Sequence, residues 1–342
     1  MTNRERVIAA IRHEEPDYTP HSIVFTREML NKMIQYTGNP DYISTINNHI
    51  IKAAVRKPQA PIPNRTDYFF DEFDVIWDKS GVDKDIGAVA EYQLKTADDI
   101  AAYVPPPIDR AYVHEQLRHL MEIKGDNFAI SSIGFTVFER AWSLCGMLDL
   151  LCYMKTDPEA TLSLFQKLTE RNLELTKISL EYDIDGVIFG DDWGQQRGLI
   201  MGPDLWREML KPCFRTLYGE VKAKGKYVLQ HCCGDISAIF DDLVEIGLDV
   251  HQTFQPELFD LSRYKQKFAG KLTIWGALST QVDLPFLTPP EIYELTQNTI
   301  ALLGKGGGYI AAPTHDVPPD VPPENLEAMV KAFKDQAISQ GH

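Results

Sequence analysis

The sequence predicts an α/β protein, built as one large domain over residues 1–342 with a (β/α)8 TIM-barrel fold. Three observations predict this class. Short runs of branched and aromatic residues alternate with segments of helical periodicity, nearly without interruption from residue 126 onward. Strands separated by helices pair in parallel through right-handed crossovers. A doubly wound open sheet is the alternative, but no G-x-G-x-x-G motif follows the first strand.

The predicted strands are short apolar runs rich in residues that favour strands. They cover residues 22–25, 128–133, 186–190, 227–230, 250–253, 272–275 and 309–312, with weaker candidates at 75–77 and 89–94. The stretch 36–110 is less regular than the rest of the chain. We therefore predict an N-terminal insertion over one end of the barrel.

Several helix starts are marked by capping residues. Thr2 with Glu5 and Thr288 with Glu291 have the spacing of capping boxes. Asp157 precedes a proline and an acid, which is a typical helix start. The predicted buried face of the helix that follows Asp157 consists of Leu162, Phe165, Leu168, Leu175 and Ile178.

Composition and charge exclude several classes of function. The formal net charge of −15, from 34 basic and 49 acidic residues, disfavours nucleic acid or an anionic membrane as the main partner. The N-terminus has no apolar core of a secretory signal, and no run of 18 apolar residues occurs, so we expect a cytoplasmic protein without a membrane span. Five irregularly spaced cysteines do not resemble a disulfide framework, which leaves buried thiols and possible ligands.

The C-terminal ends of barrel strands carry the chemistry in this fold. Polar and ionisable residues follow almost every predicted strand of this chain. We expect substrate contacts from Arg27, Thr136, Gln255 and Ser279. Asp191 and Asp192 are the candidate catalytic acids, because at least one of them should point into the barrel mouth and orient a ligand or take a proton. The alternative for this pair is helix capping or a solvated loop.

The segment HCCGD follows one predicted strand and contains metal-ligating residue types. Side chains alternate along a strand, so His231 and Cys233 should point to one side and Cys232 to the other. One imidazole and one thiolate on one face are half of a tetrahedral zinc site. The alternative is a core histidine beside small buried cysteines.

Several segments carry a family resemblance. ERVIAAIRHEEPDYTP, GDDWGQQRGLIMGPDLWREMLKP, HCCGDI and GGYIAAPTHDVPPDVPPEN together resemble the uroporphyrinogen decarboxylase-like superfamily. The H-x-C-G segment is similar to its branch of zinc-containing, cobamide-dependent methyltransferases, which pass a methyl group from a methylated corrinoid protein to a thiol such as coenzyme M. The resemblance implies the barrel fold, a bound zinc ion and a corrinoid supplied by a partner protein.

The resemblance also implies roles for individual residues. His231 and Cys233 match the family's H-x-C zinc ligands, and His315 stands where the coenzyme M enzymes have a third ligand, a cysteine. Two histidines and one cysteinate would leave the zinc site with a charge of about +1, against about 0 for the coenzyme M enzymes, so the acceptor could be a thiol or a reduced pterin. The decarboxylases carry an arginine-rich N-terminal segment, where this chain has only Arg27. Their pyrrole-binding aspartate would correspond to Asp71 or Asp74.

The sequence therefore predicts a zinc-dependent methyltransferase that moves a methyl group between a methyl-corrinoid protein and a small-molecule acceptor. Two alternatives remain open. One is a uroporphyrinogen decarboxylase-type lyase that acts on a carboxylated substrate. The other is a barrel that binds a tetrapyrrole or corrinoid without chemistry. The sequence leaves the direction of transfer and the oligomeric state open.

Overall fold

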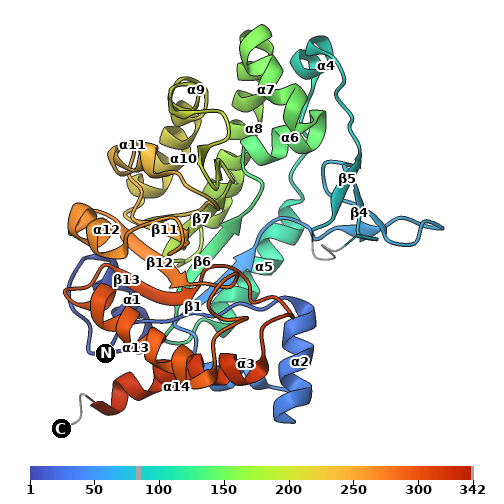
Figure 1. Cartoon of the computed structure of the whole chain (residues 1–342). Coiled ribbons are helices and arrows are strands. Elements are labelled where there is room, and N and C mark those ends of the chain that lie inside the picture. The colour runs from blue at the N-terminus through green and yellow to red at the C-terminus, as the bar shows by residue number, and fades with distance from the viewer. Residues whose placement is uncertain (82–85, 340–342) are drawn as a thin grey trace.

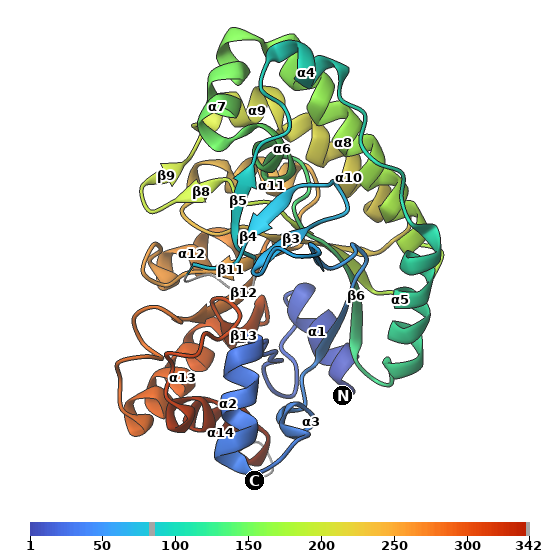
Figure 2. The same cartoon turned by 90° about the vertical axis from the view of Figure 1, so that its right-hand side faces the viewer.

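The computed structural model describes residues 1–81 and 86–339 of the chain. Seven parallel strands form one curled sheet, in which each strand neighbours the next of the seven in chain order (Figures 1 and 2). The strands are β1 (Ile50–Ala54), β6 (Phe128–Ile133), β7 (Gly186–Gly190), β10 (Tyr227–His231), β11 (Val250–Phe254), β12 (Thr273–Leu278) and β13 (Tyr309–Pro313). The α/β class with a parallel, curled sheet is thereby confirmed.

An extended segment, residues 20–25, lies between the two edge strands of this sheet. The Ser22 N–H donates to the Ala311 carbonyl of β13 at 3.1 Å, and the His49 N–H, just before β1, donates to the His21 carbonyl at 3.0 Å. The segment thus contacts both edges of the seven-stranded sheet, and within the described residues the eighth strand of the predicted barrel is not formed. The segment forms isolated bridges in place of the continuous strand predicted for residues 22–25.

Most helices lie on the outer face of the sheet, as expected for parallel strands joined by crossovers (Figure 1). The helices are α1 (Asn3–Ile11), α2 (Arg27–Thr37), α3 (Tyr42–Ile46), α4 (Ala97–Ala102), α5 (Arg110–Ile123), α6 (Phe138–Cys145), α7 (Met147–Thr156), α8 (Pro158–Ser179), α9 (Pro203–Met209), α10 (Lys211–Ala223), α11 (Phe240–Glu245), α12 (Leu261–Phe268), α13 (Pro289–Gly304) and α14 (Pro323–Ser339). A 3₁₀ turn, η1 (Ser237–Ile239), precedes α11. No helix in the described part of the chain is long and apolar enough to cross a membrane.

Two apolar clusters pack against opposite faces of the curled sheet. The larger cluster fills the space between the sheet and the outer helices, and it includes Val187 and Phe189 of β7. The smaller cluster lies inside the curl and includes Ile188 and Leu229. Val7 of α1 joins the inner cluster, so this helix fills one end of the curl. Successive residues of β7 thus face opposite clusters, as the period of a strand requires.

A second sheet forms part of the irregular N-terminal stretch. It is antiparallel, with the order β2-β3-β4-β5, and projects to one side of the molecule (Figure 1). Its strands are β2 (Ala60–Pro61), β3 (Tyr68–Phe70), β4 (Ile76–Asp78) and β5 (Ala88–Glu91). Asp71 in this sheet region forms a buried ion pair with Arg140 of α6 at 2.6 Å, and Glu72 pairs with Arg56 at 2.7 Å. These pairs attach the small sheet to α6 and to the segment that follows β1.

Some local predictions are confirmed and others are wrong. Both capping boxes, at Thr2 and Thr288, are present. The prediction that Leu162 belongs to the buried face of α8 is wrong, because its side chain is 40% exposed. Thr161 and Leu164 are buried instead, since positions 161, 164, 165 and 168 share the helical face to which 162 does not belong. The side chain of Asp157 does not cap α8; it accepts a hydrogen bond from the Thr156 hydroxyl.

Candidate metal centre and active site

Three potential metal ligands meet at the C-terminal ends of β10 and β13. His231 ends β10, Cys233 follows two residues later, and His315 lies in the loop after β13. One nitrogen of each histidine and the Cys233 sulfur all lie within 4.8 Å of one another. The His231 Nε2–Cys233 Sγ distance is 3.8 Å, close to the about 3.6 Å that tetrahedral zinc bound by one imidazole and one thiolate requires. We call these three residues the triad.

The two neighbouring cysteines face opposite sides of β10, as strand alternation predicts. Cys232 is fully buried and belongs to the outer apolar cluster. Its sulfur accepts the Trp193 backbone N–H at 3.2 Å, and burial raises the pKa of its thiol well above the usual value. Cys233 is partly exposed beside His231. Only Cys233 of the two can therefore reach a metal held by the histidines.

A neighbouring strand fixes the orientation of His231. Gln252 of β11 is its register partner, and the amide oxygen of Gln252 lies 2.7 Å from His231 Nδ1. An amide oxygen only accepts, so Nδ1 carries the proton and the Nε2 lone pair points toward Cys233. A carboxylate or amide behind a metal-binding histidine is a common second contact in metal sites. This role was missed from the sequence, although the inward position of Gln252 on the strand beside β10 is readable there.

His315 lies beside His231, with the two ring centroids 5.5 Å apart. A hydrogen bond with Cys233 raises the pKa of His315, and the charge of Asp316 acts in the same direction. Among the described residues, no hydrogen bond joins the side chains of Asp316 and His315.

Two cavities meet at the triad. The first, of about 240 Å³, lies inside the mouth of the curled sheet and is lined by His231, His315, Asp192 and Glu139 among others; we call it the barrel cavity. The second, of about 280 Å³, lies among the loops and is lined by Cys233 and Gln255 as well as His315; we call it the loop cavity. A metal held by the triad would thus be reachable from both sides.

The two neighbouring aspartates have different surroundings. Asp191 is fully buried, and its carboxylate accepts the backbone N–H groups of Phe138 at 2.9 Å and Glu139 at 2.8 Å, as well as the Trp193 ring N–H at 2.9 Å. It therefore holds the N-terminus of α6, where a carboxylate also complements the helix dipole. Burial raises the pKa of Asp191 to about 6, although these N–H groups act in the opposite direction.

Asp192 is the carboxylate of the pair that lines the barrel cavity. Its Oδ1 accepts the Cys233 backbone N–H at 2.8 Å and lies 3.9 Å from His231 Nε2. It therefore fixes the backbone of one triad residue while its side chain stays about one third exposed to the cavity. A catalytic role for Asp191 or Asp192 stays a prediction, and the geometry favours Asp192.

Glu139 is an acidic residue of the barrel cavity that was missed from the sequence. It lies in the first turn of α6, past the residues that directly follow β6. Burial raises its pKa well above the usual value, and the charges of Asp192, Asp191 and Cys233 raise it further. A carboxylic acid with a raised pKa holds its proton to higher pH than usual, which makes Glu139 a candidate proton donor to a ligand. The sequence signal that could have identified Glu139 is an acidic residue a few positions after a predicted strand.

The raised pKa of Glu139 predicts a specific pH dependence of stability. Because the folded state holds the proton more tightly than the unfolded state, the free energy of unfolding should fall as pH rises from the ordinary pKa through the raised one. A tenfold difference in proton affinity between the two states is equivalent to about 1.4 kcal/mol. In metal-free protein, Glu139→Gln should therefore match the wild type near pH 4 and be more stable at pH 8. Thermal unfolding between pH 4 and pH 8 measures this difference in stability, with the exposed Glu115→Gln as control. If the stabilities of the wild type and Glu139→Gln change with pH in parallel, the pKa of Glu139 is not raised.

The predicted substrate residues are divided between cavity and core. Gln255 lines the loop cavity, and its side chain accepts the Gly234 N–H at 2.8 Å. Thr136 is buried, with its hydroxyl bonded to two backbone carbonyls. Ser279 is buried and accepts the backbone N–H of two residues in its own loop. Arg27 is exposed at the start of α2. Neither Arg27, Thr136 nor Ser279 lines the two cavities, and their substrate contacts stay predictions.

The aspartates compared with the pyrrole-binding residue lie elsewhere. Asp71 is buried and accepts hydrogen bonds from the Arg140 guanidinium and the Trp77 ring nitrogen. Asp74 is exposed. The Arg140 side chain also stacks over the Phe73 ring at 4.1 Å. These contacts hold the Asp71 carboxylate within the protein, so it is poorly placed to bind a ligand.

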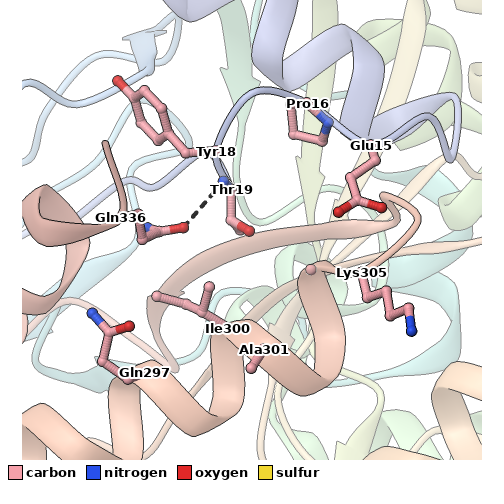
Figure 3. Close-up of a pocket in the computed structure, with 10 residues that line it drawn as sticks. Glu15, Pro16, Tyr18, Thr19, Gln297, Ile300, Ala301, Lys305 and Gln336 are labelled. Carbon is pink, nitrogen blue, oxygen red and sulfur yellow. Dashed lines mark hydrogen bonds between the residues drawn. The ribbon is translucent and has the colours of Figure 1, made fainter. Parts of the chain in front are cut away.

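Another cavity, of about 350 Å³, lies at the end of the sheet opposite the triad. Figure 3 shows residues that line it. It is lined by the segment after α1, including Glu15 and Thr19, and by the C-terminal end of α13, which precedes β13. The Thr19 N–H donates to the Gln336 side chain there at 3.1 Å. In folds of this type the catalytic groups lie at the C-terminal ends of the parallel strands. The triad lies at that end and this cavity does not, so the triad region is the candidate active site.

Comparisons with known proteins agree with this architecture. The family model for uroporphyrinogen decarboxylase (URO-D) matches residues 79–336. A uroporphyrinogen decarboxylase from Coxiella burnetii (strain Dugway 5J108-111) is 22% identical over 304 residues, which covers 83% of this chain and 81% of that relative. The structure of a methyltransferase from Methanosarcina mazei superposes with a TM-score of 0.73 at 15% identity, covering 98% of this chain and 99% of the other, and so has a similar fold. Because the family match spans most of the chain, the protein belongs to the uroporphyrinogen decarboxylase family.

Proposed function

We propose that the protein is a zinc-dependent methyltransferase that moves a methyl group between a corrinoid protein and a small acceptor, either a thiol or a reduced pterin. One observation carries the proposal: His231, Cys233 and His315 converge within 4.8 Å at the strand ends that line two cavities. The similar fold of a methyltransferase supports it.

The triad fits zinc better than magnesium or calcium. Imidazole and thiolate are preferred by zinc, whereas the other two cations take oxygen ligands. Three protein ligands are typical of catalytic zinc sites, in which the fourth position remains for a substrate. A zinc ion there would lower the pKa of an acceptor thiol or hydroxyl and so supply a nucleophile at neutral pH.

The protein's own groups prepare this reaction. Gln252 holds the His231 ring so that Nε2 faces the metal position. Asp192 fixes the backbone of Cys233 and presents a carboxylate to the barrel cavity, where it can take the proton that the acceptor loses. A corrinoid carried by a partner protein would supply the methyl group without its bonding electron pair, which the corrinoid would keep, and the acceptor heteroatom would provide the pair for the new bond. The transfer consumes no oxidant or reductant.

A uroporphyrinogen decarboxylase-type lyase is the second candidate, supported by the family model and the Coxiella relative. Such an enzyme would need cationic groups for several substrate carboxylates. Arg27, the expected carboxylate-binding residue, does not line either cavity at the triad. The methyltransferase is therefore the stronger proposal.

Metal analysis combined with an activity assay tests the proposal. Protein purified in metal-free buffers with added zinc should retain roughly one zinc ion per chain, and anomalous scattering at the zinc edge should place it between the triad residues. A chelator should remove the zinc and abolish demethylation of methylcobalamin by added thiols, and zinc should restore it. Zinc-free protein that releases carbon dioxide from a carboxylated porphyrinogen would support the lyase. Corrinoid binding without turnover would indicate a carrier.

A further inference from the structure

We propose that a third cavity on this side of the protein, separate from the triad, binds a small aromatic carboxylate. The cavity has a volume of about 350 Å³ and is lined by η1, α11, α12 and the loop before α12. Four aromatic side chains contribute to its walls, namely Phe240, Phe259, Tyr264 and Phe268. We call it the aromatic cavity. Of the described residues that line it, none lines the barrel cavity or the loop cavity.

The aromatic walls are held in place by contacts with one another. The Phe240 ring makes edge-to-face pairs with Tyr264, at 5.2 Å between centroids, and with Phe268, at 5.5 Å. Phe259 lies 5.7 Å from Phe240 and stacks on Phe254 of β11 at 4.6 Å. Phe240 is almost fully buried, whereas Phe259 stays partly exposed. The cavity therefore presents preformed aromatic surface to solvent, and a ligand ring would both cover this surface and pair with its rings.

The Tyr264 hydroxyl is a second indication of a ligand. Its oxygen is buried and has no hydrogen-bond partner among the described residues, and the side chain as a whole is only 6% exposed. Buried polar groups in folded proteins are nearly always hydrogen-bonded. Since Tyr264 lines the cavity, a polar ligand atom that reaches this hydroxyl would complete its hydrogen bond.

Arg263 of α12 determines the charge of the ligand. Its side chain is exposed and lines the cavity, and within the described residues no hydrogen bond or ion pair involves its guanidinium. The nearby acids are already engaged. Asp260 caps α12 by accepting the Arg263 backbone N–H at 2.9 Å, and Asp241 pairs with Lys267 at 3.0 Å. The free guanidinium offers a planar fork of donors, which matches a carboxylate better than any neutral group.

The size of the aromatic cavity limits the ligand further. A volume of about 350 Å³ lies at the lower end of the range of small-molecule sites, which runs from about 300 to about 1,000 Å³. It suits a ligand of one or two rings. An aliphatic acid would lack the ring for the aromatic walls, and an aromatic amine would place a cation beside Arg263. The implied ligand class is a planar aromatic acid with a single carboxylate.

Calorimetric titration of the full-length protein with indole-3-acetate and indole-3-acetamide tests this inference. The two probes share one ring system and differ in charge. The wild type should bind the acid about tenfold more tightly than the amide, as expected for one charge-assisted contact. This preference should be the same with and without zinc, because the aromatic cavity is separate from the triad.

Two variants separate the charge from the ring contacts. Arg263→Gln keeps a good helix-forming residue on an exposed site, so it should fold, bind zinc like the wild type and lose the preference for the acid. Phe259→Leu should weaken the binding of both probes, because it removes a ring from the wall. Arg118→Gln, the same exchange on an exposed position of α5, is the matched control and should keep the preference.

The outcomes distinguish this inference from the proposed function. Equal binding of the two probes, or no binding of either, overturns the inference. A preference that persists in Arg263→Gln overturns it as well, and so does binding of the acid that disappears when zinc is removed, since the acid would then occupy the triad. A protein that binds no zinc but prefers the acid through Arg263 overturns the proposed function and leaves this inference intact.

Discussion

Replacing Cys233 by serine is expected to abolish tight zinc binding and methyl transfer, whereas replacing Cys232 by serine should leave zinc bound. The Cys233 sulfur lies 3.8 Å from His231 Nε2, within the triad. The Cys232 sulfur lies on the other side of β10 and accepts the Trp193 N–H. Serine is a poor zinc ligand because its hydroxyl stays protonated, so the first variant loses a thiolate from the site. The second variant changes only a buried packing contact.

Zinc affinity, measured by competition with a coloured chelator, compares both variants with His231→Ala and His315→Ala. His231 is held in its metal-binding orientation by Gln252, so its removal should reduce affinity most among the histidines. Removal of His315 should also weaken binding, by at least about tenfold, if it is the third ligand. Wild-type affinity in His315→Ala would exclude it from the site. Equal zinc loss in the two cysteine variants would contradict the opposite facing of their side chains.

The placement of the triad depends on features that are local in sequence. His231 and Cys233 are two residues apart at a strand end, and this spacing alone predicts that they share a face. The position of His315 follows from strand order, since parallel strands present their C-terminal ends at one rim. The strands after residue 126 were predicted within a few residues of their observed ends, because each is a compact apolar run.

Other features depend on contacts between distant segments and could not be predicted locally. β1 was missed because IIKAA contains a lysine and two alanines, which favour strands weakly; its pairing with β6 stabilises it. The role of Gln252 then requires the register of the assembled sheet. Glu139 required the fold as well, since its raised pKa comes from burial and from carboxylates on another strand exit.

The neighbouring aspartates show most clearly that the role of a side chain can depend on contacts with distant segments. Strand alternation predicts that Asp191 and Asp192 point in opposite directions, but it does not say which of them faces the cavity. The answer depends on α6, whose first backbone N–H groups converge on Asp191. Asp191 follows β7 but binds the N-terminus of α6, a helix that follows a different strand, so no local sequence pattern around Asp191 indicates this contact. Only the packed structure distinguishes its structural contacts from a catalytic position.

This arrangement leads to opposite expectations for two matched substitutions. Asp191→Asn should destabilise the fold by about 3 kcal/mol, because an amide offers one acceptor oxygen and places an NH₂ group against N–H donors that the carboxylate now satisfies. Asp192→Asn should leave the melting temperature nearly unchanged, since this side chain is about one third exposed, but should lower turnover by removing the cavity carboxylate that takes a proton.

Thermal unfolding and methyl-transfer rates of both variants, each loaded with zinc, measure the difference. Asp192→Asn retains an oxygen that can accept the Cys233 N–H, so its zinc affinity should stay close to that of the wild type and any loss of rate reflects chemistry. Asp191→Asn should lose stability even in metal-free protein, because its contacts are to the N-terminus of α6 and the Trp193 ring. If Asp191→Asn instead unfolds like the wild type and loses turnover, Asp191 acts in catalysis and the capping contacts contribute little to the fold.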